Sequence, residues 1–540
     1  MLTGFFLPSF GPLQNNFGIS VSTEMIAVPM RVLAAPSVNY RSNVSIKPQS
    51  GGWNMRQGSK FILVGPQSRQ FHWTRLVLNF GNTEPSAQDL KMNLDELTRT
   101  LLSCGLAMPY HNNTRTPARM TRGLPWSEYI DKKSQLTTEF EQLLLQEKSI
   151  GLVYVVIVGC LKAEAPLYAA VKWMGDLRFG VNTVCSLLDK FIRNPKGQAQ
   201  YLANIALKMN LKTGGTNHYV TLGPCAKDAM IVGADVTHPG PSSARYCPSI
   251  AAVVGNNDAN FANYPASLRL QEGRREVPKS PIPLPPSPLP PKLPHDSLTL
   301  SPSQMIKDLG AMLAERLHSY HNASKTLPRR IIFYRDGVSE SQYAAVMEQE
   351  LPQIRDACRT ISQHYKGPNA PLIRITLIIV GKRHHTRFFP SSRTHMDARN
   401  GNPMPGAVVD RAVTDPYDFD FFLQSHQGLR GTARPCHYYV LIDENKFDVD
   451  DLQRMTYYLS YNFARANRSV SVCTPAYYAD IACERARCYL YSMLVNDRTV
   501  KPKSSLPSWA MAEARAMVDG WWAGPSKAVH ERLKRTMFYL

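Results

Sequence analysis

Residues 233–239 read G-A-D-V-T-H-P, residues 334–339 read Y-R-D-G-V-S, and these two stretches decide the fold. Each contains an aspartate that ends a short apolar run, M-I-V-G-A before Asp235 and I-I-F-Y-R before Asp336. Short, β-branched runs of this kind predict buried strands. Two carboxylates at neighbouring strand ends can share divalent metal ions that hydrolyse phosphodiesters. A single aspartate at such a position is more often a turn or cap residue, but the pair favours a metal site.

Composition and charge narrow the class of protein. A chain of 540 residues with 44% hydrophobic and 19% charged residues is long enough for two to four globular domains. The 62 lysines and arginines exceed the 42 acidic residues, and this net charge of +20 indicates a polyanionic partner such as nucleic acid. Ten cysteines without a C-x-x-C pair indicate neither zinc nor disulfides. No apolar stretch is long enough to span a membrane. We expect a reducing compartment, namely the cytoplasm, with the nucleus as the alternative.

Strand and helix patterns alternate along the chain, which predicts an α/β fold. A strand pattern at 151–158 followed by a helix from residue 165 indicates a small doubly wound, Rossmann-like domain at 75–223. A second domain, 224–540, is consistent with a ribonuclease H-like fold. Its expected strands lie near 249–255, 330–335, 372–380 and 437–442. Residues 1–74 form an N-terminal segment and linker, in which 17–33 alternate as a strand would.

A proline-rich insertion at 277–304 interrupts the second domain. Its ten prolines exclude a packed helix or a central strand. One interpretation is a ligand for proline-binding domains. Another is a translated intron, because the 28 codons begin with valine (GT) and end with glutamine (CAG). Removing them joins R-R-E to M-I-K-D-L and leaves a helix with one apolar face: Met305, Ile306, Leu309, Met312, Leu313 and Leu317.

Four motifs resemble the PIWI domain of eukaryotic Argonaute proteins. They are G-A-D-V-T-H-P at 233–239, I-I-F-Y-R-D-G-V-S-E at 331–340, G-K-R-H-H-T-R-F-F at 381–389 and T-P-A-Y-Y-A-D at 474–480. The resemblance extends from about Asn16 to Leu540 and begins in the linker before the middle (MID) domain. It implies a MID domain at 75–223 and a PIWI domain at 224–540. Nothing in this sequence resembles the family's N-terminal and PAZ domains.

The resemblance also implies a catalytic tetrad of Asp235, Glu276, Asp336 and Asp480. Asp235, Asp336 and Asp480 would bind Mg²⁺, or Mn²⁺, since hard cations prefer carboxylate oxygens. Glu276 would orient the attacking water, with Glu272 as its nearest competitor for that role. Asp480 could instead cap the helix that continues to residue 487. The proline-rich insertion begins directly after Glu276, which puts its placement in doubt.

The motif P-L-Y-A-A-V-K at 166–172 resembles the MID-domain site for the guide's 5′ phosphate. The residues implied at this site are Tyr168, Lys172, Lys208, Lys212, Arg485 and Leu540. Tyr168 would stack on the first base, and Val184 stands where many Argonautes have glutamine. Each lysine pair alone is more often a solvated helix face. The residues implied to contact the guide backbone are Lys382, Arg383, Arg387 and Arg434.

Three functions are compatible with these residues. The first is a guide-directed endoribonuclease of RNA silencing, which binds a small 5′-phosphorylated guide RNA and cuts a complementary target RNA. The second is a guide-binding scaffold that does not cut, because of the insertion beside Glu276 and the missing PAZ domain. The third is an unguided nuclease or transposase, which the 5′-phosphate motif disfavours.

Overall fold

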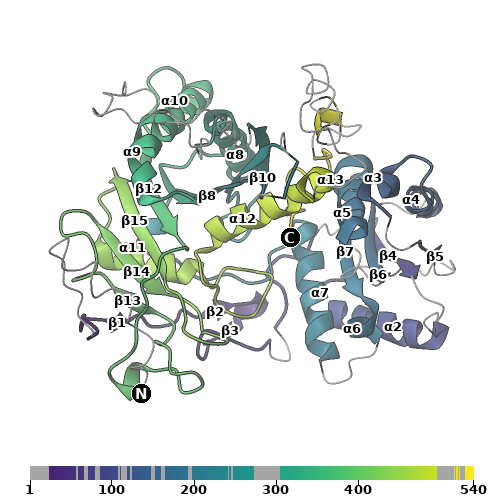
Figure 1. Cartoon of the computed structure of the whole chain (residues 1–540), viewed down its shortest axis with the longest axis horizontal. Helices are drawn as coiled ribbons and strands as arrows, with labels where there is room; N and C mark the ends of the chain where they lie inside the picture. The colour runs from purple at the N-terminus through teal and green to yellow at the C-terminus, as the bar shows by residue number, and fades with distance from the viewer. Residues whose placement is uncertain are drawn as a thin grey trace, which may run out of the picture.

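The structure, a computed structural model, describes the chain in segments. They are residues 24–55, 59–65, 71–79, 86–107, 110, 118–121, 124–147, 152–159, 165–192, 197–240, 242–244, 247–272, 305–495, 516, 518–520, 522 and 529–540. Most of the described residues belong to two α/β units, which lie side by side (Figure 1). None of the helices in these segments is long and apolar enough to cross a lipid bilayer.

The smaller unit is built on a four-stranded parallel sheet. Its strands are β4 (Phe71–Asn79), β5 (Ala118–Arg119), β6 (Leu152–Gly159) and β7 (Asn182–Leu187), in the order β5-β4-β6-β7. Side chains alternate between the two faces of a strand, so Trp73 and Val77 of β4 point one way and Leu76 and Leu78 the other. The sheet therefore has an apolar surface on both faces, and it begins before the predicted limit at residue 75.

Helices cover both faces of this sheet. Trp73 and Val77 pack in one cluster with α2 (Ala87–Ser103) and α7 (Gln198–Lys212). Leu76 and Leu78 share the other cluster with α3 (Trp126–Ile130), α4 (Gln135–Glu147) and α5 (Ala165–Trp173). Helix α5 continues as the π-helix η2 (Met174–Phe179). A parallel sheet with helices on both faces is the predicted Rossmann-like architecture.

The larger unit is built on a nine-stranded mixed sheet. Its order is β1-β13-β14-β15-β12-β11-β8-β9-β10. The strands are β1 (Arg31–Val32), β8 (Ala229–Thr237), β9 (Ser249–Gly255), β10 (Ala266–Gln271), β11 (Arg330–Asp336), β12 (Arg374–Gly381), β13 (Ala407–Val409), β14 (Asp420–Gln424) and β15 (Cys436–Asp443). Strands β8, β9 and β10 form an antiparallel meander, and β11 lies parallel to both β8 and β12. This topology confirms the predicted ribonuclease H-like fold.

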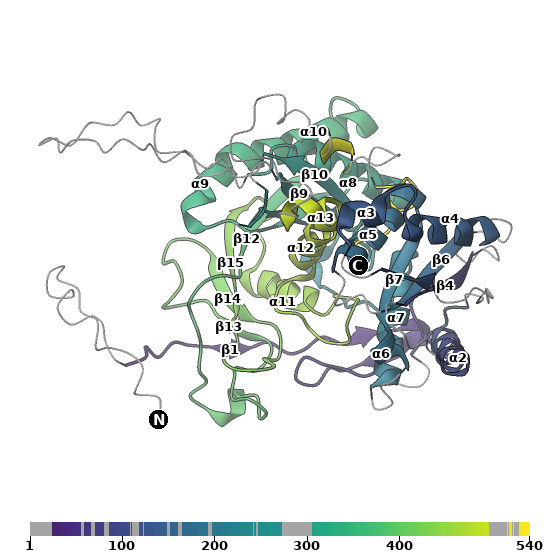
Figure 2. The same cartoon turned by 45° about the vertical axis from the view of Figure 1, so that its right-hand side comes forward.

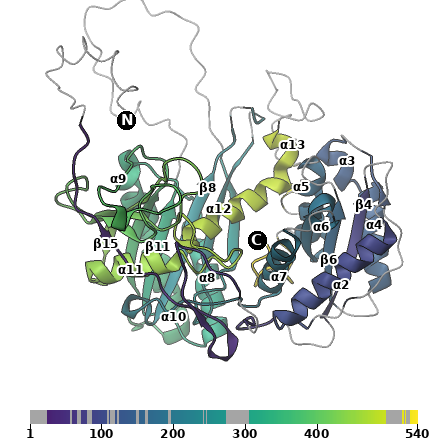
Figure 3. The same ribbon diagram turned by 90° about the horizontal axis from the view of Figure 1, so that it is seen from below.

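The two faces of the large sheet bury different helices. Odd positions of β11, such as Phe333, share a cluster with α8 (Leu309–Ser324) and α10 (Leu351–Lys366). Even positions, such as Tyr334, share the other cluster with α11 (Val449–Leu459) and α12 (Thr474–Arg487). Figure 3 shows α12 crossing the sheet toward the smaller unit. We call this side of the sheet the α12 face.

Two predicted elements begin later than the sequence suggested. Within residues 24–33 only Arg31–Val32 forms a strand, because pairing with β13 is confined to those two positions. The helix after the insertion starts at Leu309 and not at Met305. Met305 and Ile306 are buried all the same, since the Ile306 N–H donates to the fully buried carboxylate of Glu350 at 2.7 Å.

The segment before the small sheet joins the two units. Strand β1 adds to the edge of the large sheet, and Asn39 then bridges to Tyr219 beyond α7 (Figure 2). The indole of Trp53 donates to the Tyr40 hydroxyl and stacks on Tyr461 at a centroid distance of 6.0 Å. The linker therefore packs against both units.

Candidate functional site

The fold brings Asp235 and Asp336 to one edge of the large sheet. β8 and β11 are parallel neighbours in which Arg335 pairs with Ala234. The next residues on the two strands, Asp336 and Asp235, therefore lie side by side. Asp235 continues the odd positions of β8, and Asp336 continues the even positions of β11. Ile231 of β8 and Tyr334 of β11 lie in the core under α12. Both carboxylates therefore project on the α12 face.

Helix α12 supplies the third acid. Asp480 lies in the middle of α12, so it does not cap the helix, and its side chain is 42% exposed. Gly233 lets the first turn of this helix approach β8, because a Cβ there would lie 2.0 Å from the carbonyl oxygen of Pro475. Only glycine permits this approach, which places Asp480 over the ends of β8 and β11.

An ammonium group lies among these carboxylates. The Nζ atom of Lys382 is 2.5 Å from Asp336 Oδ2 and 3.6 Å from Asp480 Oδ1. Lys382 directly follows β12, in which Val380 pairs with Asp336. Side chains two residues apart along a strand point to the same face, so Lys382 projects on the α12 face with Asp336. The predicted guide-backbone residue Lys382 thus lies within the acidic cluster, which consists of Asp235, Asp336 and Asp480.

Burial and mutual repulsion control the charges of this cluster. Burial, and then the negative charge of Asp336, raise the pKa of Asp235 to about 7. Burial also raises the pKa of Asp336, although the Lys382 ammonium opposes that shift. Burial would lower the pKa of Lys382, but the carboxylates of Asp336, Asp480 and Asp235 outweigh it and raise that pKa. The site is an acidic cluster that stabilises a cation.

The donor set fits a hard divalent metal ion. Mg²⁺ and Mn²⁺ prefer carboxylate oxygens, and the charges of Asp336 and Asp480 add to burial in raising the pKa of Asp235, so the three carboxylates are close enough to interact. Among the described residues no three acidic, histidine or cysteine side chains are arranged to hold a metal ion, and the Lys382 ammonium lies between Asp336 and Asp480.

The predicted glutamate, Glu276, lies outside the described residues. Its competitor Glu272 directly follows β10 and forms an exposed ion pair with Lys307, 3.1 Å between Oε2 and Nζ. His238, three residues after Asp235, is hydrogen-bonded through Nδ1 to the Ser249 hydroxyl at 2.8 Å, as expected of a structural histidine. The assignment of Glu276 stays a prediction.

A basic cluster lies where the smaller unit meets α12. Lys172 of α5 donates from Nζ to both the carbonyl and the hydroxyl of Thr183, each at 2.9 Å, and lies 5.3 Å from the centroid of the Tyr168 ring. Tyr168 and Lys172 therefore share one face of α5, as their spacing predicts. Val184 packs in the core against α7 and contributes no polar atom to this cluster.

Helix α7 contributes two more cations. Lys212 is buried and donates to the carbonyl of Phe538 at 2.7 Å. Burial, together with the positive charges of Arg465 and Lys172, lowers the pKa of Lys208 to about 8. Arg465 lies in the loop after α11, and the sequence analysis missed it. No helical spacing links Arg465 to the lysines of α5 and α7, which lie far away in the sequence. Only the fold shows that it belongs to the basic cluster.

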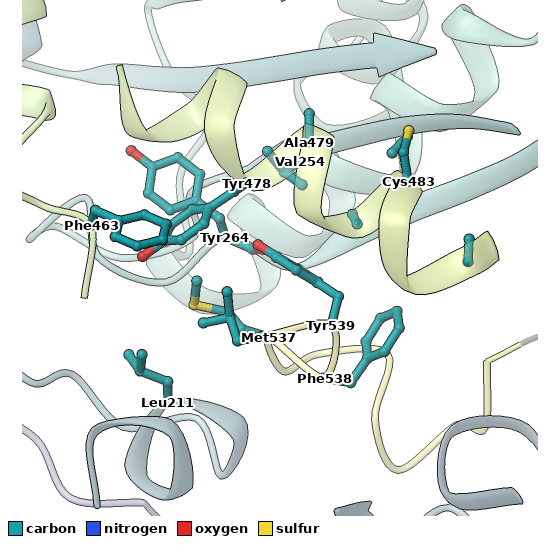
Figure 4. Close-up of a cluster of buried hydrophobic side chains, with 14 of the residues drawn as sticks. Leu211, Val254, Tyr264, Phe463, Tyr478, Ala479, Cys483, Met537, Phe538 and Tyr539 are labelled. Atoms are coloured by element: carbon teal, nitrogen blue, oxygen red, sulfur yellow. The ribbon is translucent and has the colours of Figure 1, made fainter. Parts of the chain in front are cut away.

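Arg485 of α12 joins this cluster to the chain terminus. Its guanidinium donates to the carboxylate of Asp176 and to the terminal residue Leu540, each at 3.0 Å. The tail before Leu540 is wedged between α12 and α7, where Met537 and Tyr539 lie beneath Tyr478 (Figure 4). Asp176 and the chain terminus oppose a larger number of cations, namely Lys172, Lys208, Lys212, Arg465 and Arg485. This excess of buried positive charge suits an anionic ligand.

The other predicted backbone contacts, Arg383, Arg387 and Arg434, lie beside Lys382, and we call this group of arginines the rim. Arg383 is exposed, and Arg387 donates to the carbonyl of Thr386 at 2.7 Å. Arg434 reaches back to the carbonyl of Lys382 at 3.4 Å. His384 contacts the carbonyl of Pro435 at 2.9 Å, so it helps to hold the loop. The ion pairs within the described segments include none of these three arginines.

A ribonuclease H-like sheet with an acidic cluster, joined to a Rossmann-like sheet with a basic cluster, defines the MID–PIWI class of proteins. The Piwi domain family model matches residues 155–491. Protein argonaute 12 of Oryza sativa subsp. japonica is 33% identical over 97% of this chain, which spans 46% of that protein. The chain belongs to the Argonaute family, and it covers about half the length of this relative.

Solved structures show the same architecture. The C-terminal lobe of a budding yeast Argonaute superposes with a TM-score of 0.73 at 28% identity and 95% coverage of both chains. Kluyveromyces polysporus Argonaute with a guide RNA gives a TM-score of 0.72 at 28% identity, covering 95% of this chain and 54% of the other.

Proposed function

We propose that this chain binds a 5′-phosphorylated small guide RNA in its basic cluster and cuts a complementary RNA at its acidic cluster. The convergence of Asp235, Asp336 and Asp480 on the α12 face is the observation that carries the cleavage. The likeness to the Kluyveromyces polysporus Argonaute structure, which contains a guide RNA, supports the binding.

The basic cluster accounts for selection of the 5′ end. Lys172 of α5 and Lys208 of α7 offer ammonium donors to a terminal phosphate, and the Arg485 charge is near enough to lower the pKa of both lysines. Bonds between ionised donors and phosphate are about twice as strong as neutral ones. Tyr168 lies beside Lys172 and offers a ring for the first base. Target sequence is then recognised by base pairing with the guide.

The acidic cluster accounts for cleavage. Asp235, Asp336 and Asp480 would hold Mg²⁺ or Mn²⁺ through their carboxylate oxygens. Such ions, when bound, activate water and stabilise the leaving oxygen of a phosphodiester. The protein's own contribution is position: β8, β11 and α12 fix the three carboxylates, and the arginines at the rim orient the RNA backbone. Glu276 is proposed as the residue that orients the water.

A guide-binding scaffold without cleavage is the second candidate. The insertion begins directly after Glu276, and a displacement of about 1 Å costs about a hundredfold in rate. The two sides of the insertion are nevertheless held together. The Gln271 amide donates to the carbonyl of Met305 at 3.1 Å, and Glu272 pairs with Lys307. Residues 273–276 therefore suffice to span the connection when 277–304 are deleted.

The test is cleavage of a labelled complementary RNA by the chain loaded with a 5′-phosphorylated guide in Mg²⁺. A single cut whose position follows the guide's 5′ end supports the nuclease. Tight guide binding without a cut, in the native chain and after deletion of 277–304, supports the scaffold. Cutting that ignores guide sequence contradicts both.

A further inference from the structure

Lys382 occupies the position in the acidic cluster where positive charge is most needed. Its ammonium contacts Asp336, whose side chain is 3% exposed, and approaches Asp480, which is 42% exposed. These two residues come from different elements, β11 and α12, so the lysine bridges two of the three carboxylates that would hold a metal ion. A metal ion and this ammonium cannot both lie between the two carboxylates, because they would need the same oxygen atoms and would repel each other.

The lysine side chain has a route out of the cluster. It is 30% exposed, and its backbone belongs to the rim, where Arg434 bonds to its carbonyl and Arg383 follows it in the chain. A lysine side chain has a flexible four-carbon stem. Its ammonium can therefore leave a carboxylate for another anion without movement of the strand. Arg383, Arg387 and Arg434 at the rim attract a phosphate backbone to this position.

We propose that Lys382 fills the metal position of the guide-free protein, and that the backbone of a bound guide RNA draws its ammonium onto a phosphate, so that guide loading opens the site to divalent metal. This inference rests on the proposed guide binding. It makes Lys382 a positioning residue with two alternative partners, the carboxylates of Asp336 and Asp480 or the RNA. Metal binding is thereby restricted to protein that already carries a guide.

Linkage makes the coupling reciprocal. If the guide raises metal affinity by removing a competing ammonium, the metal raises guide affinity by the same factor, because both transitions close one thermodynamic cycle. Couplings of this kind are typically about 5- to 150-fold. Substitution of Lys382 by methionine removes the competitor and keeps most of the stem's apolar volume. The guide-free variant then behaves toward metal as the loaded protein does.

The experiment measures binding of Mn²⁺ by electron paramagnetic resonance, which requires no turnover. The full chain is titrated with and without a saturating 5′-phosphorylated guide, and guide alone is the blank. Lys382→Met is compared with Lys366→Met, which removes a positive charge from the exposed end of α10. Thermal unfolding of each variant checks that it is folded.

We expect guide loading to raise the Mn²⁺ affinity of the native chain about tenfold or more, and that of Lys366→Met similarly. Guide-free Lys382→Met should bind Mn²⁺ about tenfold more tightly than guide-free native chain, and loading should add less than about twofold. Equal Mn²⁺ affinity of the native chain with and without bound guide overturns the inference while guide binding stands. Failure of the chain to bind guide at all overturns the proposed function, and guide-free Lys382→Met still tests the competition.

Discussion

The basic cluster and the acidic cluster are opposite in charge and differ in how complete they are. Around Lys172 and Arg485, cations outnumber anions, yet their donors are already fixed by Thr183, Asp176 and the chain terminus. In the acidic cluster three carboxylates face one ammonium group, that of Lys382, and the fourth predicted acid lies outside the described residues. The basic cluster is preformed for an anion. In the acidic cluster, the Lys382 ammonium occupies the position that we propose for a metal ion.

The difference shows what each site needs before it can act. Hydrogen bonds to backbone and to Asp176 already hold the basic cluster, so we expect binding to require little rearrangement. Under the proposed function, the acidic cluster has to exchange Lys382 for metal before cleavage. Binding and cleavage should therefore respond differently to substitution, and four predictions follow from this contrast.

The largest effect is expected for Asp336→Asn. Asparagine keeps the shape of the side chain but removes the negative charge that contacts the Lys382 ammonium. Cleavage should therefore fall more than about a hundredfold while guide affinity is unchanged. Single-turnover cleavage and filter binding measure the two quantities. Asp356→Asn, on the exposed surface of α10, is the matched control. A parallel loss of guide binding would show that the two clusters are not separate.

The next effect is expected for Gly337→Ala. Gly337 has φ +82°, and a Cβ there would lie 2.7 Å from Asp235 Oδ1, so the carboxylate has to move. We expect a loss of about 1–3 kcal/mol in stability and about a hundredfold in cleavage. Gly367→Ala has the same φ with nothing near its Cβ, and it should lose stability alone in urea unfolding. Equal cleavage by both variants would contradict the placement of Asp235.

A smaller effect is expected when the guide's 5′ phosphate is replaced by hydroxyl. Each lost charge-assisted hydrogen bond is worth about 1.5–3 kcal/mol, so affinity should fall about ten- to hundredfold. Lys208→Met should remove most of this discrimination, whereas Lys190→Met, exposed on α6 (Leu188–Ile192), should not. Competition between the two guides measures it. Identical affinities for both guides in the native chain would rule out the basic cluster as the 5′ pocket.

The smallest effect is a pH dependence of guide binding. Burial and neighbouring cations lower the pKa of Lys208 to about 8, so the free protein loses this charge above pH 8. Phosphate binding then requires uptake of a proton, and affinity should fall by up to about tenfold between pH 7 and 9.

Lys208→Arg is the control for this pH dependence, because arginine stays charged over the whole range and should flatten the curve. Some slope should persist, since burial also lowers the pKa of Lys172 and of Lys212. An unchanged slope in Lys208→Arg would show that Lys208 is not the group that titrates.

Local pattern was enough for the strands that carry the acids. The apolar runs before Asp235 and Asp336 predicted β8 and β11, because short β-branched runs near a glycine are typical of buried strands. Pattern failed at the limits of elements. The start of α8 at Leu309 depends on Glu350, which bonds the Ile306 N–H from a distant helix. Propensity carries no information about such a partner.

The sequence by itself determined the fold class, the family, and which faces of strands and helices the acids and lysines occupy. Those follow from periods of 2 and 3.6 residues, which are properties of each element alone. Only the tertiary structure decided that Arg465 joins the lysines of α5 and α7, and that Lys382 lies between Asp336 and Asp480. The interaction of two charged side chains depends on the distance between them in the folded protein. Residues far apart in the chain come within that distance only after the sheets and α12 have packed.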